Sequence, residues 1–227
     1  MWDLPDPQIR GSRVYARGCD DVAGVAAILA AMDVVAREHP DRLLCALLTR
    51  AEEVGFAGAF AACRCGSIPP GAIVVAIECS SAVTGVTMGG GPILRVGDFS
   101  TVFTPAATQW CRTVARELLA AQPDFAFQRK LMDGGSCEST VYCEFGCDAT
   151  GVCIALGNYH NMDTARERIS SEYIHLGDWH NMVRWFVAMA TTDRKYDGKQ
   201  ADLRKRLSKL ENQYRKQLRR TTGGPPL

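Results

Sequence analysis

Five residues able to bind metal ions or move protons stand out, because each follows an apolar run. They are Asp20 after residues 13–19, Glu52 and Glu53 after 43–51, Glu78 after 72–77, and His160 after 151–159. In an open α/β sheet the functional crevice lies outside the carboxyl ends of the strands, so these side chains can converge. Carboxylates and imidazoles are common ligands of divalent ions. The pattern therefore indicates a metal centre that activates water.

Each residue also has a simpler interpretation. Asp20 or Asp21 can cap the helix that follows, which is the commonest role of aspartate at such a position. The glutamate pair can belong to a solvated loop, Glu78 to the rim of the sheet, and His160 to the surface. Taken singly, these interpretations are favoured. Taken together, they require several buried runs to end in metal-binding residues by coincidence, which favours a common site.

The adjacent residues Glu52 and Glu53 can perform two different functions in one metal site. One carboxylate can bind an ion while its neighbour accepts a proton from water and passes it to the leaving group. Successive residues within a strand point to opposite faces, so both can face one cavity only at the irregular end of a strand. The turn containing Gly55 and Gly58 permits that geometry.

The elements that must position these residues alternate between strand-like and helical patterns, which is typical of a layered α/β fold. Residues 43–49 (LLCALLT) form a continuous apolar run, which predicts a central strand covered on both faces. The segment 81–104 predicts strands and loops at the edge of the sheet. Further strands are expected at 13–19, 72–77, 125–132 and 151–157, and helices at 21–39, 58–65, 105–122 and 176–191.

Two motifs resemble those of a known family. Asp20-Asp21-Val-Ala-Gly24 resembles the Asp-x-x-x-Gly metal motif of the di-zinc exopeptidases, and Glu52-Glu53-Val-Gly55-Phe-Ala-Gly58 resembles their Glu-Glu-x-Gly-x-x-Gly motif. The resemblance is closest to the tetrahedral aminopeptidase and glutamyl aminopeptidase branch, and it covers residues 13 to 192. It implies a three-layer α/β/α fold with a mixed sheet.

The resemblance also implies roles for the site residues. Asp20 would bridge two divalent ions, zinc or else cobalt or manganese, and Glu52 would be the general base. Glu53 and His160 would bind one ion, and Glu78 the other. The substrate would be a peptide.

One feature departs from the family. Its members carry a further metal-binding histidine in a His-x-Asp motif before the bridging aspartate, and residues 1–19 contain no histidine. The fold is therefore expected to be incomplete at its N-terminus. Three explanations stay open: a fragment of a longer enzyme, a partner that supplies the rest, or a fold that persists without catalysis. A missing strand would also expose a sheet edge, which favours association, and a homo-oligomer is expected.

Composition is that of a globular protein, with 47% hydrophobic and 22% charged residues and a net charge of +1. The ten cysteines lack the paired C-x-x-C spacing of a zinc ribbon, and reduced, mostly buried thiols are expected, including Cys45, Cys79 and Cys153. Lys and Arg crowd into the C-terminal segment, where a narrow apolar stripe lies on a basic helix. We expect a linker at 1–12, a catalytic domain at 13–192, and this helix and tail at 193–227.

These patterns favour a metal-dependent aminopeptidase in the cytoplasm, because neither a membrane span nor a signal peptide is evident. The alternative is a catalytically impaired peptidase-like remnant that acts through association. Nucleic-acid binding by the basic helix is a weaker third hypothesis, because no recognition motif accompanies its charges.

Overall fold

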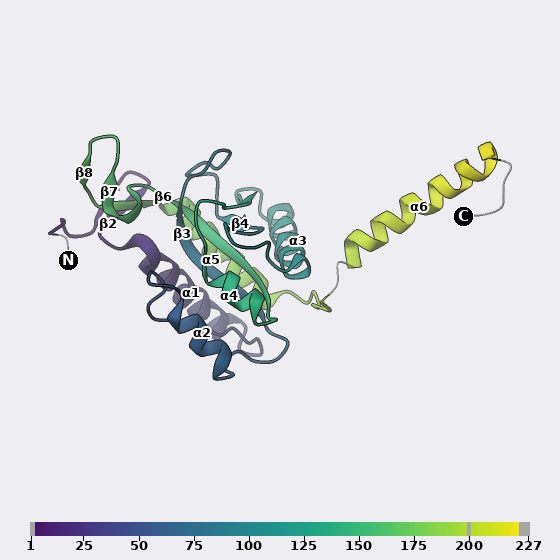
Figure 1. Ribbon diagram of the computed structural model, residues 1–227, viewed down its shortest axis with the longest axis horizontal. Coiled ribbons are helices and arrows are strands. Elements are labelled where there is room, and N and C mark those ends of the chain that lie inside the picture. Colours follow the sequence, from purple (N-terminus) through teal and green to yellow (C-terminus); the bar gives the residue numbers. More distant parts are fainter. Residues whose placement is uncertain (1–2, 199–200, 223–227) are drawn as a thin grey trace.

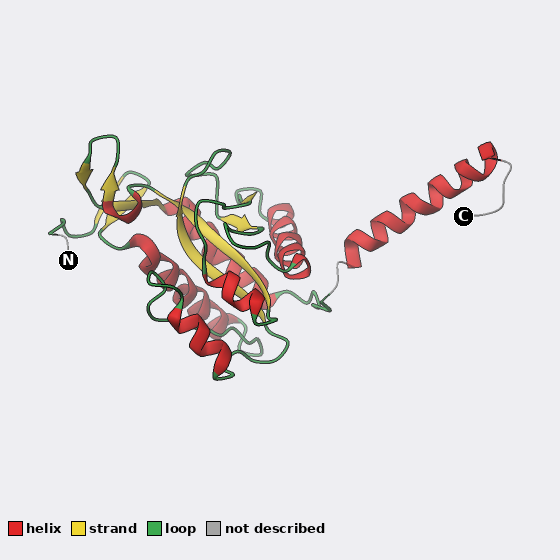
Figure 2. Cartoon of the chain, in the orientation of Figure 1, coloured by secondary structure: helices red, strands yellow, loops and turns green. Residues whose placement is uncertain are grey.

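The computed structural model describes residues 3–198 and 201–222, and the body of the chain is a three-layer α/β/α fold. Figure 2 shows the long strands of the sheet crossing the middle of the body between helices. The predicted fold class is therefore confirmed. No helix among the described residues is long and apolar enough to cross a membrane.

The central sheet is mixed and has the order β3-β6-β4-β5. Its strands are β3 (Ile73–Ser81), β4 (Ile93–Arg95), β5 (Gln128–Lys130) and β6 (Asp148–Leu156). β3 runs parallel to β6 over its whole length, whereas β4 runs antiparallel to β6 and parallel to β5. Because β3 ends the order, one of its edges has no strand partner within the described chain.

Helices cover both faces of this sheet (Figure 1). One face packs on α1 (Cys19–Glu38), α3 (Pro105–Ala121) and α5 (Leu176–Thr191), around the fully buried Trp185. The other face packs on α2 (Ala57–Arg64) and α4 (Glu138–Glu144), around Ala76 and Ala149. Side chains of β3 alternate between these two clusters, as the period of a strand requires.

A second, smaller sheet lies beside the carboxyl end of β3. It has the order β1-β2-β9, and its strands are antiparallel: β1 (Gln8–Arg10), β2 (Arg13–Ala16) and β9 (Glu172–His175). A 3₁₀ turn, η1 (Tyr159–Asn161), and a short hairpin of β7 (Met162–Asp163) and β8 (Arg168–Ile169) lead into β9. This sheet holds the start of α1 and the end of β6 near each other.

Three local predictions were wrong. Residues 43–49 are not a strand, and Leu43, Leu47 and Leu48 are exposed. Cys45 is exposed rather than buried, although Cys79 and Cys153 are buried as predicted. The segment 81–104 does not lie at the sheet edge, because β4 pairs with a strand on each side and is fully buried. An apolar run shows that a segment tends to be buried, but not which strands will flank it.

The basic C-terminal segment forms α6 (Ala201–Thr222), as its periodicity predicts. Of its apolar stripe, Leu207, Leu210 and Tyr214 are exposed. The side chain of Leu218, the last member of that stripe, lies outside the described part of the chain.

Candidate metal centre

Asp20 lies where α1 begins, and contacts from two strands fix its position. Its backbone N–H donates to Glu172 Oε2 at 3.1 Å, and its Oδ1 accepts the backbone N–H of Cys79 at 3.4 Å. Asp20 and Asp21 both have non-helical backbone angles, and the cap residue before them is Gly18. Asp20 therefore does not serve as a simple helix cap, and its carboxylate is held against the carboxyl end of β3.

Glu53 and His160 meet near Asp20 although they lie over a hundred positions apart in the sequence. One ligand atom from each of Asp20, Glu53 and His160 lies within 4.8 Å of the others. His160 Nε2 is 3.7 Å from Glu53 Oε2. Two carboxylates and one imidazole are a donor set that suits a divalent ion such as zinc. These three residues fit a metal ion, and we call them the Asp20 cluster.

The backbone around His160 adopts a conformation that residues other than glycine rarely take. Asn158, His160 and Asn161 all have positive φ angles, between 53° and 62°. The imidazole stacks on Tyr159, with ring centroids 3.9 Å apart. Non-glycine residues in left-handed conformations are concentrated at functional sites, where the surrounding structure holds them in place.

Electrostatics at the cluster favour a cation. Burial, followed by the nearby charge of Glu53, raises the pKa of Asp20 to about 6. Burial and the charge of Asp20 raise the pKa of Asp21 to about 7. Crowded carboxylates resist ionisation unless a positive charge offsets their repulsion. A divalent ion would supply that charge.

Glu52 lies next to this cluster but is not part of it. Its backbone carbonyl accepts the N–H groups of Gly55 and Phe56, which closes the tight turn after the glutamate pair. Burial, followed by the charge of Glu53, raises the pKa of Glu52 to about 7. A carboxylate with a pKa near neutrality can both accept and return a proton.

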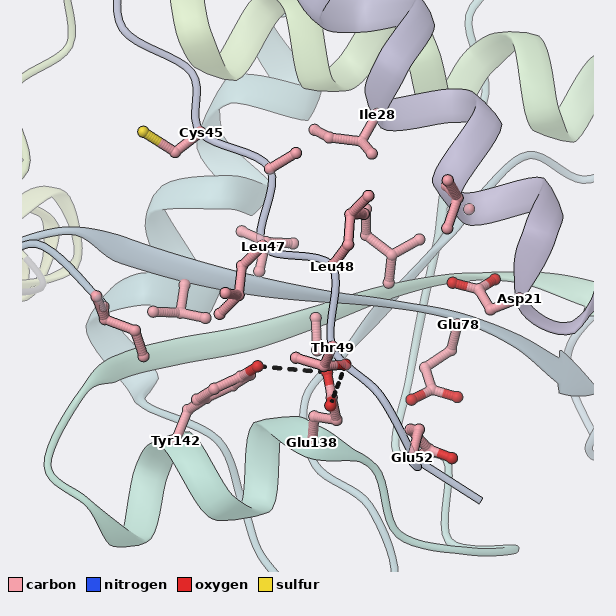
Figure 3. Close-up of a pocket in the computed structure, with 18 of the residues that line it drawn as sticks. Asp21, Ile28, Cys45, Leu47, Leu48, Thr49, Glu52, Glu78, Glu138 and Tyr142 are labelled. Atoms are coloured by element: carbon pink, nitrogen blue, oxygen red, sulfur yellow. Dashed lines mark hydrogen bonds between the residues drawn. The ribbon is translucent and has the colours of Figure 1, made fainter. Parts of the chain in front are cut away.

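Glu78 lies on the same pocket as Glu52 and Asp21 (Figure 3). Its Oε2 is 3.9 Å from Nη1 of the buried Arg95, and no cluster of potential ligands among the described residues includes Glu78. Burial raises the pKa of Glu78 well above its ordinary value, and Arg95 opposes that shift. The structure brings Glu78 toward the other carboxylates but gives it a protein cation as its neighbour.

A second group, Asp20, Asp21 and Cys79, is also compact enough to hold an ion. The Cys79 thiol, however, donates to the carbonyl of Cys19, and burial raises its pKa well above the ordinary value. A metal-binding cysteine must be a thiolate, so this group is the weaker candidate.

Sequence reasoning missed three residues that shape the site. Glu172 positions the backbone of Asp20, Arg95 neutralises Glu78, and Tyr159 supports His160. A charged residue inside a strand-like run is a weak signal that could have found Arg95 and Glu172. Nothing in the local sequence indicates which carboxylate or backbone group they contact.

Comparisons with known proteins agree with this architecture. A family model described as M42 glutamyl aminopeptidase matches residues 5–179. The chain is similar to the TET1 peptidase of Pyrococcus horikoshii, which can assemble into a tetrahedron or a large octahedral shell: TM-score 0.64, 22% identity, 82% of this chain and 52% of that chain covered. No curated protein matches it.

Two further solved structures share the fold. A TET aminopeptidase from a marine sediment archaeon of the Thaumarchaeota gives a TM-score of 0.65 at 19% identity, covering 82% of this chain and 52% of that chain. An aminopeptidase from Desulfurococcus kamchatkensis gives a TM-score of 0.63 at 21% identity, covering 83% of this chain and 52% of that chain. The chain spans about half the length of the solved structures that it matches.

Proposed function

The chain belongs to the M42 glutamyl aminopeptidase family, and from this premise we propose that it forms the metal-binding part of an aminopeptidase that hydrolyses peptides. The observation that carries the proposal is the convergence of Asp20, Glu53 and His160 on one point. We further propose that zinc binds there, with cobalt or manganese as substitutes in the same oxygen-rich site. A bound ion would act as a Lewis acid and activate water for attack on a peptide carbonyl.

The residues of the chain have separate roles in this proposal. Asp20, Glu53 and His160 hold the ion, and Tyr159 and Glu172 keep two of them in position. Glu52 accepts a proton from the attacking water on its carboxylate and returns it to the departing amine. Its pKa of about 7 supports that role, because the same group must act as base and then as acid.

A second ion, between Asp20 and Glu78, has less support from the geometry. Glu78 faces Arg95, so a second cation there would have to displace a buried guanidinium or share its carboxylate. The proposal is therefore for one ion, held by Asp20, Glu53 and His160. The number of metal ions bound per purified chain tests whether a second ion binds.

Replacing the proposed base tests the catalytic role. We expect Glu52→Gln to keep metal binding nearly unchanged and to reduce the rate of aminoacyl-p-nitroanilide hydrolysis by about a hundredfold or more, the usual effect of losing a general base. Glu38→Gln is a matched control, because Glu38 is an exposed carboxylate at the far end of α1. A Glu52→Gln rate equal to that of the wild type would refute the assignment.

The alternative function is association without catalysis, and one observation favours it. The outer edge of β3 has no strand partner in the described chain, so the fold presents a surface that another polypeptide can cover. Elemental analysis of the purified chain separates the two functions, because bound metal favours the enzyme and its absence after zinc loading favours the remnant. The assembly of the Pyrococcus horikoshii protein also leads us to propose self-association, testable by light scattering.

A further inference from the structure

Three half-buried cysteines lie on the sheet face that packs on α2 and α4. Cys63, Cys143 and Cys147 all pack against the buried apolar cluster on that face. Cys63 is in the last turn of α2, and Cys147 directly precedes β6. These two line one cavity of about 240 Å³, which Cys143 does not line. The fold therefore brings together two cysteines that lie far apart in the sequence.

Backbone and ring contacts hold this region in place. The N–H of Cys147 donates to the carbonyl of Tyr142 at 2.9 Å, and its carbonyl accepts the hydroxyl of Thr104 at 3.3 Å. Phe60 of α2 packs edge to face on Phe145, with ring centroids 6.0 Å apart. The end of α2 is thus held against the turn between α4 and β6, where the two cysteines lie.

The thiols of Cys63 and Cys147 are close enough to influence each other. Burial, followed by the nearby thiol of Cys147, raises the pKa of Cys63. Burial and then the charge of Glu138 raise the pKa of Tyr142, and both thiols add to that shift. The Cys143 thiol is directed elsewhere, because it donates to a backbone carbonyl of β6 at 3.8 Å. Cys63 and Cys147 therefore form a pair of neighbouring thiols, which we call the dithiol pair.

We propose that the dithiol pair is a covalent modification site, at which small disulfides such as oxidised glutathione convert Cys63 and Cys147 to an intramolecular disulfide. One cysteine loses its proton and attacks a sulfur of the small disulfide, whose S–S bond breaks, and the released thiolate takes up the proton. The second cysteine then displaces the other small thiol in the same way. Two protein thiols are oxidised, and one small disulfide is reduced to two thiols.

Half-burial suits the dithiol pair to this exchange. A reactive thiol must be partly accessible to the reagent, whereas a fully buried cysteine is inert. Both members of the pair are partly exposed, so a small disulfide can reach them. The buried cysteines of the chain are excluded from such a reaction in the folded state: Cys19, Cys79, Cys111, Cys137 and Cys153.

The disulfide joins two segments that carry residues of the proposed metal site. α2 begins shortly after Glu53, and β6 ends shortly before His160. The loop that the bond closes contains β3, β4, α3, β5 and α4. A cross-link that closes a long loop restricts the unfolded chain, so we expect oxidation to raise the Tm by about 5 °C or more, and reduction to reverse the rise.

Peptide mapping of the whole chain tests the site. The native protein is incubated with oxidised glutathione, its remaining thiols are alkylated in denaturant, and trypsin is added. Cleavage after Arg50 and Arg64 releases peptide 51–64, in which Cys63 is the only cysteine. Cleavage after Lys130 and Arg166 releases peptide 131–166, which contains Cys147. We expect mass spectrometry to find these two peptides joined by a reducible bond in most of the protein.

Variants identify the partner of Cys63, because peptide 131–166 contains further cysteines. Cys63→Ser and Cys147→Ser should each abolish the cross-link and leave glutathione attached to the remaining cysteine of the pair. Cys143→Ser should still form it. Cys65→Ser is the matched control, because Cys65 lies near Cys63 in the sequence but is exposed and does not line the cavity. This variant should form the cross-link as the wild type does.

Three results would overturn the proposal. The first is a wild-type protein that gains glutathione at the exposed Cys65 but forms no cross-link between the two peptides. The second is a cross-link that persists in Cys147→Ser and is lost in Cys143→Ser. The third is a lower Tm for the oxidised chain, which would mean that the bond distorts the fold. Fragmentation of the wild-type cross-linked peptide assigns the bonded cysteine even if a variant does not fold.

Discussion

Nη1 of Arg95 lies 3.9 Å from Oε2 of Glu78, with the two side chains only 4% and 14% exposed. A buried guanidinium satisfies a carboxylate as a metal ion would, so Glu78 has a counter-charge without any ion. The Asp20 cluster, by contrast, combines two carboxylates and an imidazole, and the side-chain charges that shift the pKa of Asp20 come from Glu53, Glu172 and His160 rather than from a guanidinium. Glu78 and the Asp20 cluster therefore differ in their electrostatics: a guanidinium of the protein neutralises Glu78, whereas the cluster consists of carboxylates and an imidazole.

Titration of the variants with zinc tests this difference. We expect His160→Ala to weaken zinc binding by more than the roughly 10- to 100-fold that loss of a merely supporting residue costs. Glu78→Gln should leave that affinity nearly unchanged, because Glu78 is outside the cluster. The exposed His180 in α5 provides a control, and His180→Ala should bind as the wild type does. Isothermal calorimetry against a competing chelator measures all three. Two tight ions, one lost in Glu78→Gln, would contradict the expectation.

Asp178 secures the loop that enters β4. It is 1% exposed, and its two carboxylate oxygens accept the N–H groups of Gly89 and Gly91, each at 2.7 Å. Gly91 has φ +88°, and a Cβ there would lie 2.1 Å from the carbonyl oxygen of Ala126. A side chain at this position is therefore excluded, and the loop depends on the carboxylate for its shape.

Replacing Asp178 should be costly for stability. Asp178→Ala leaves two N–H groups without their acceptor, and we expect a loss of about 3 kcal/mol or more in the free energy of unfolding. Asp178→Asn retains one acceptor oxygen and should lose less. Asp33 forms only an exposed pair with Arg37, so Asp33→Ala should cost at most about 1 kcal/mol. Urea denaturation measures each value, and equal losses for Asp178→Ala and Asp33→Ala would contradict this account.

The helices could be predicted from sequence because their signals are local. The apolar period of residues 176–191 coincides with α5, and Pro105 begins α3 as expected for a proline in the first turn. All but the last residue of the strand run 151–157 lies within the longer β6 (Asp148–Leu156), which is buried on both faces. Short-range periodicity carries enough information for elements of this kind.

The pairing of strands and the contacts between site residues could not be predicted, because both depend on residues far apart in the chain. The run 43–49 has the composition of a central strand, yet it is extended and unpaired, since no described strand lies beside it. Residue types suggested that Asp20, Glu53 and His160 belong to one site. Their meeting point depends on the left-handed backbone of η1, which no apolar pattern encodes. The Arg95–Glu78 contact is likewise a tertiary feature without a local signal.

Trp185 anchors the layer formed by α3 and α5. It is fully buried, its ring packs on Phe125 and Phe127, and its Nε1 donates to the carbonyl of Cys111 at 3.2 Å. We expect Trp185→Ala to lower the free energy of unfolding by about 3–5 kcal/mol, through the cavity and the lost contacts. Trp185→Phe keeps an aromatic ring and should cost less.

An exposed aromatic residue tests whether burial is the cause. Phe99 is 77% exposed, and Phe99→Ala should change the free energy of unfolding by no more than about 0.5 kcal/mol. Thermal and urea unfolding of the three variants give the comparison. A small loss for Trp185→Ala would mean that the α3–α5 layer does not depend on this side chain.

The body should be stable without α6. None of the three apolar clusters of the body includes a described residue of α6, and Leu207 and Tyr214 are 52% and 51% exposed. We expect deletion of residues 199–227 to leave the free energy of unfolding of the body within about 0.5 kcal/mol, because none of the described side chains of α6 belongs to those clusters. The far-ultraviolet helical signal should fall, since α6 is deleted. Calorimetry of the full and shortened chains measures the first effect and circular dichroism the second. A loss of about 2 kcal/mol or more on deletion would mean that the apolar stripe of α6 docks on the body in solution, and Leu207→Ala in the full chain should then reproduce part of that loss.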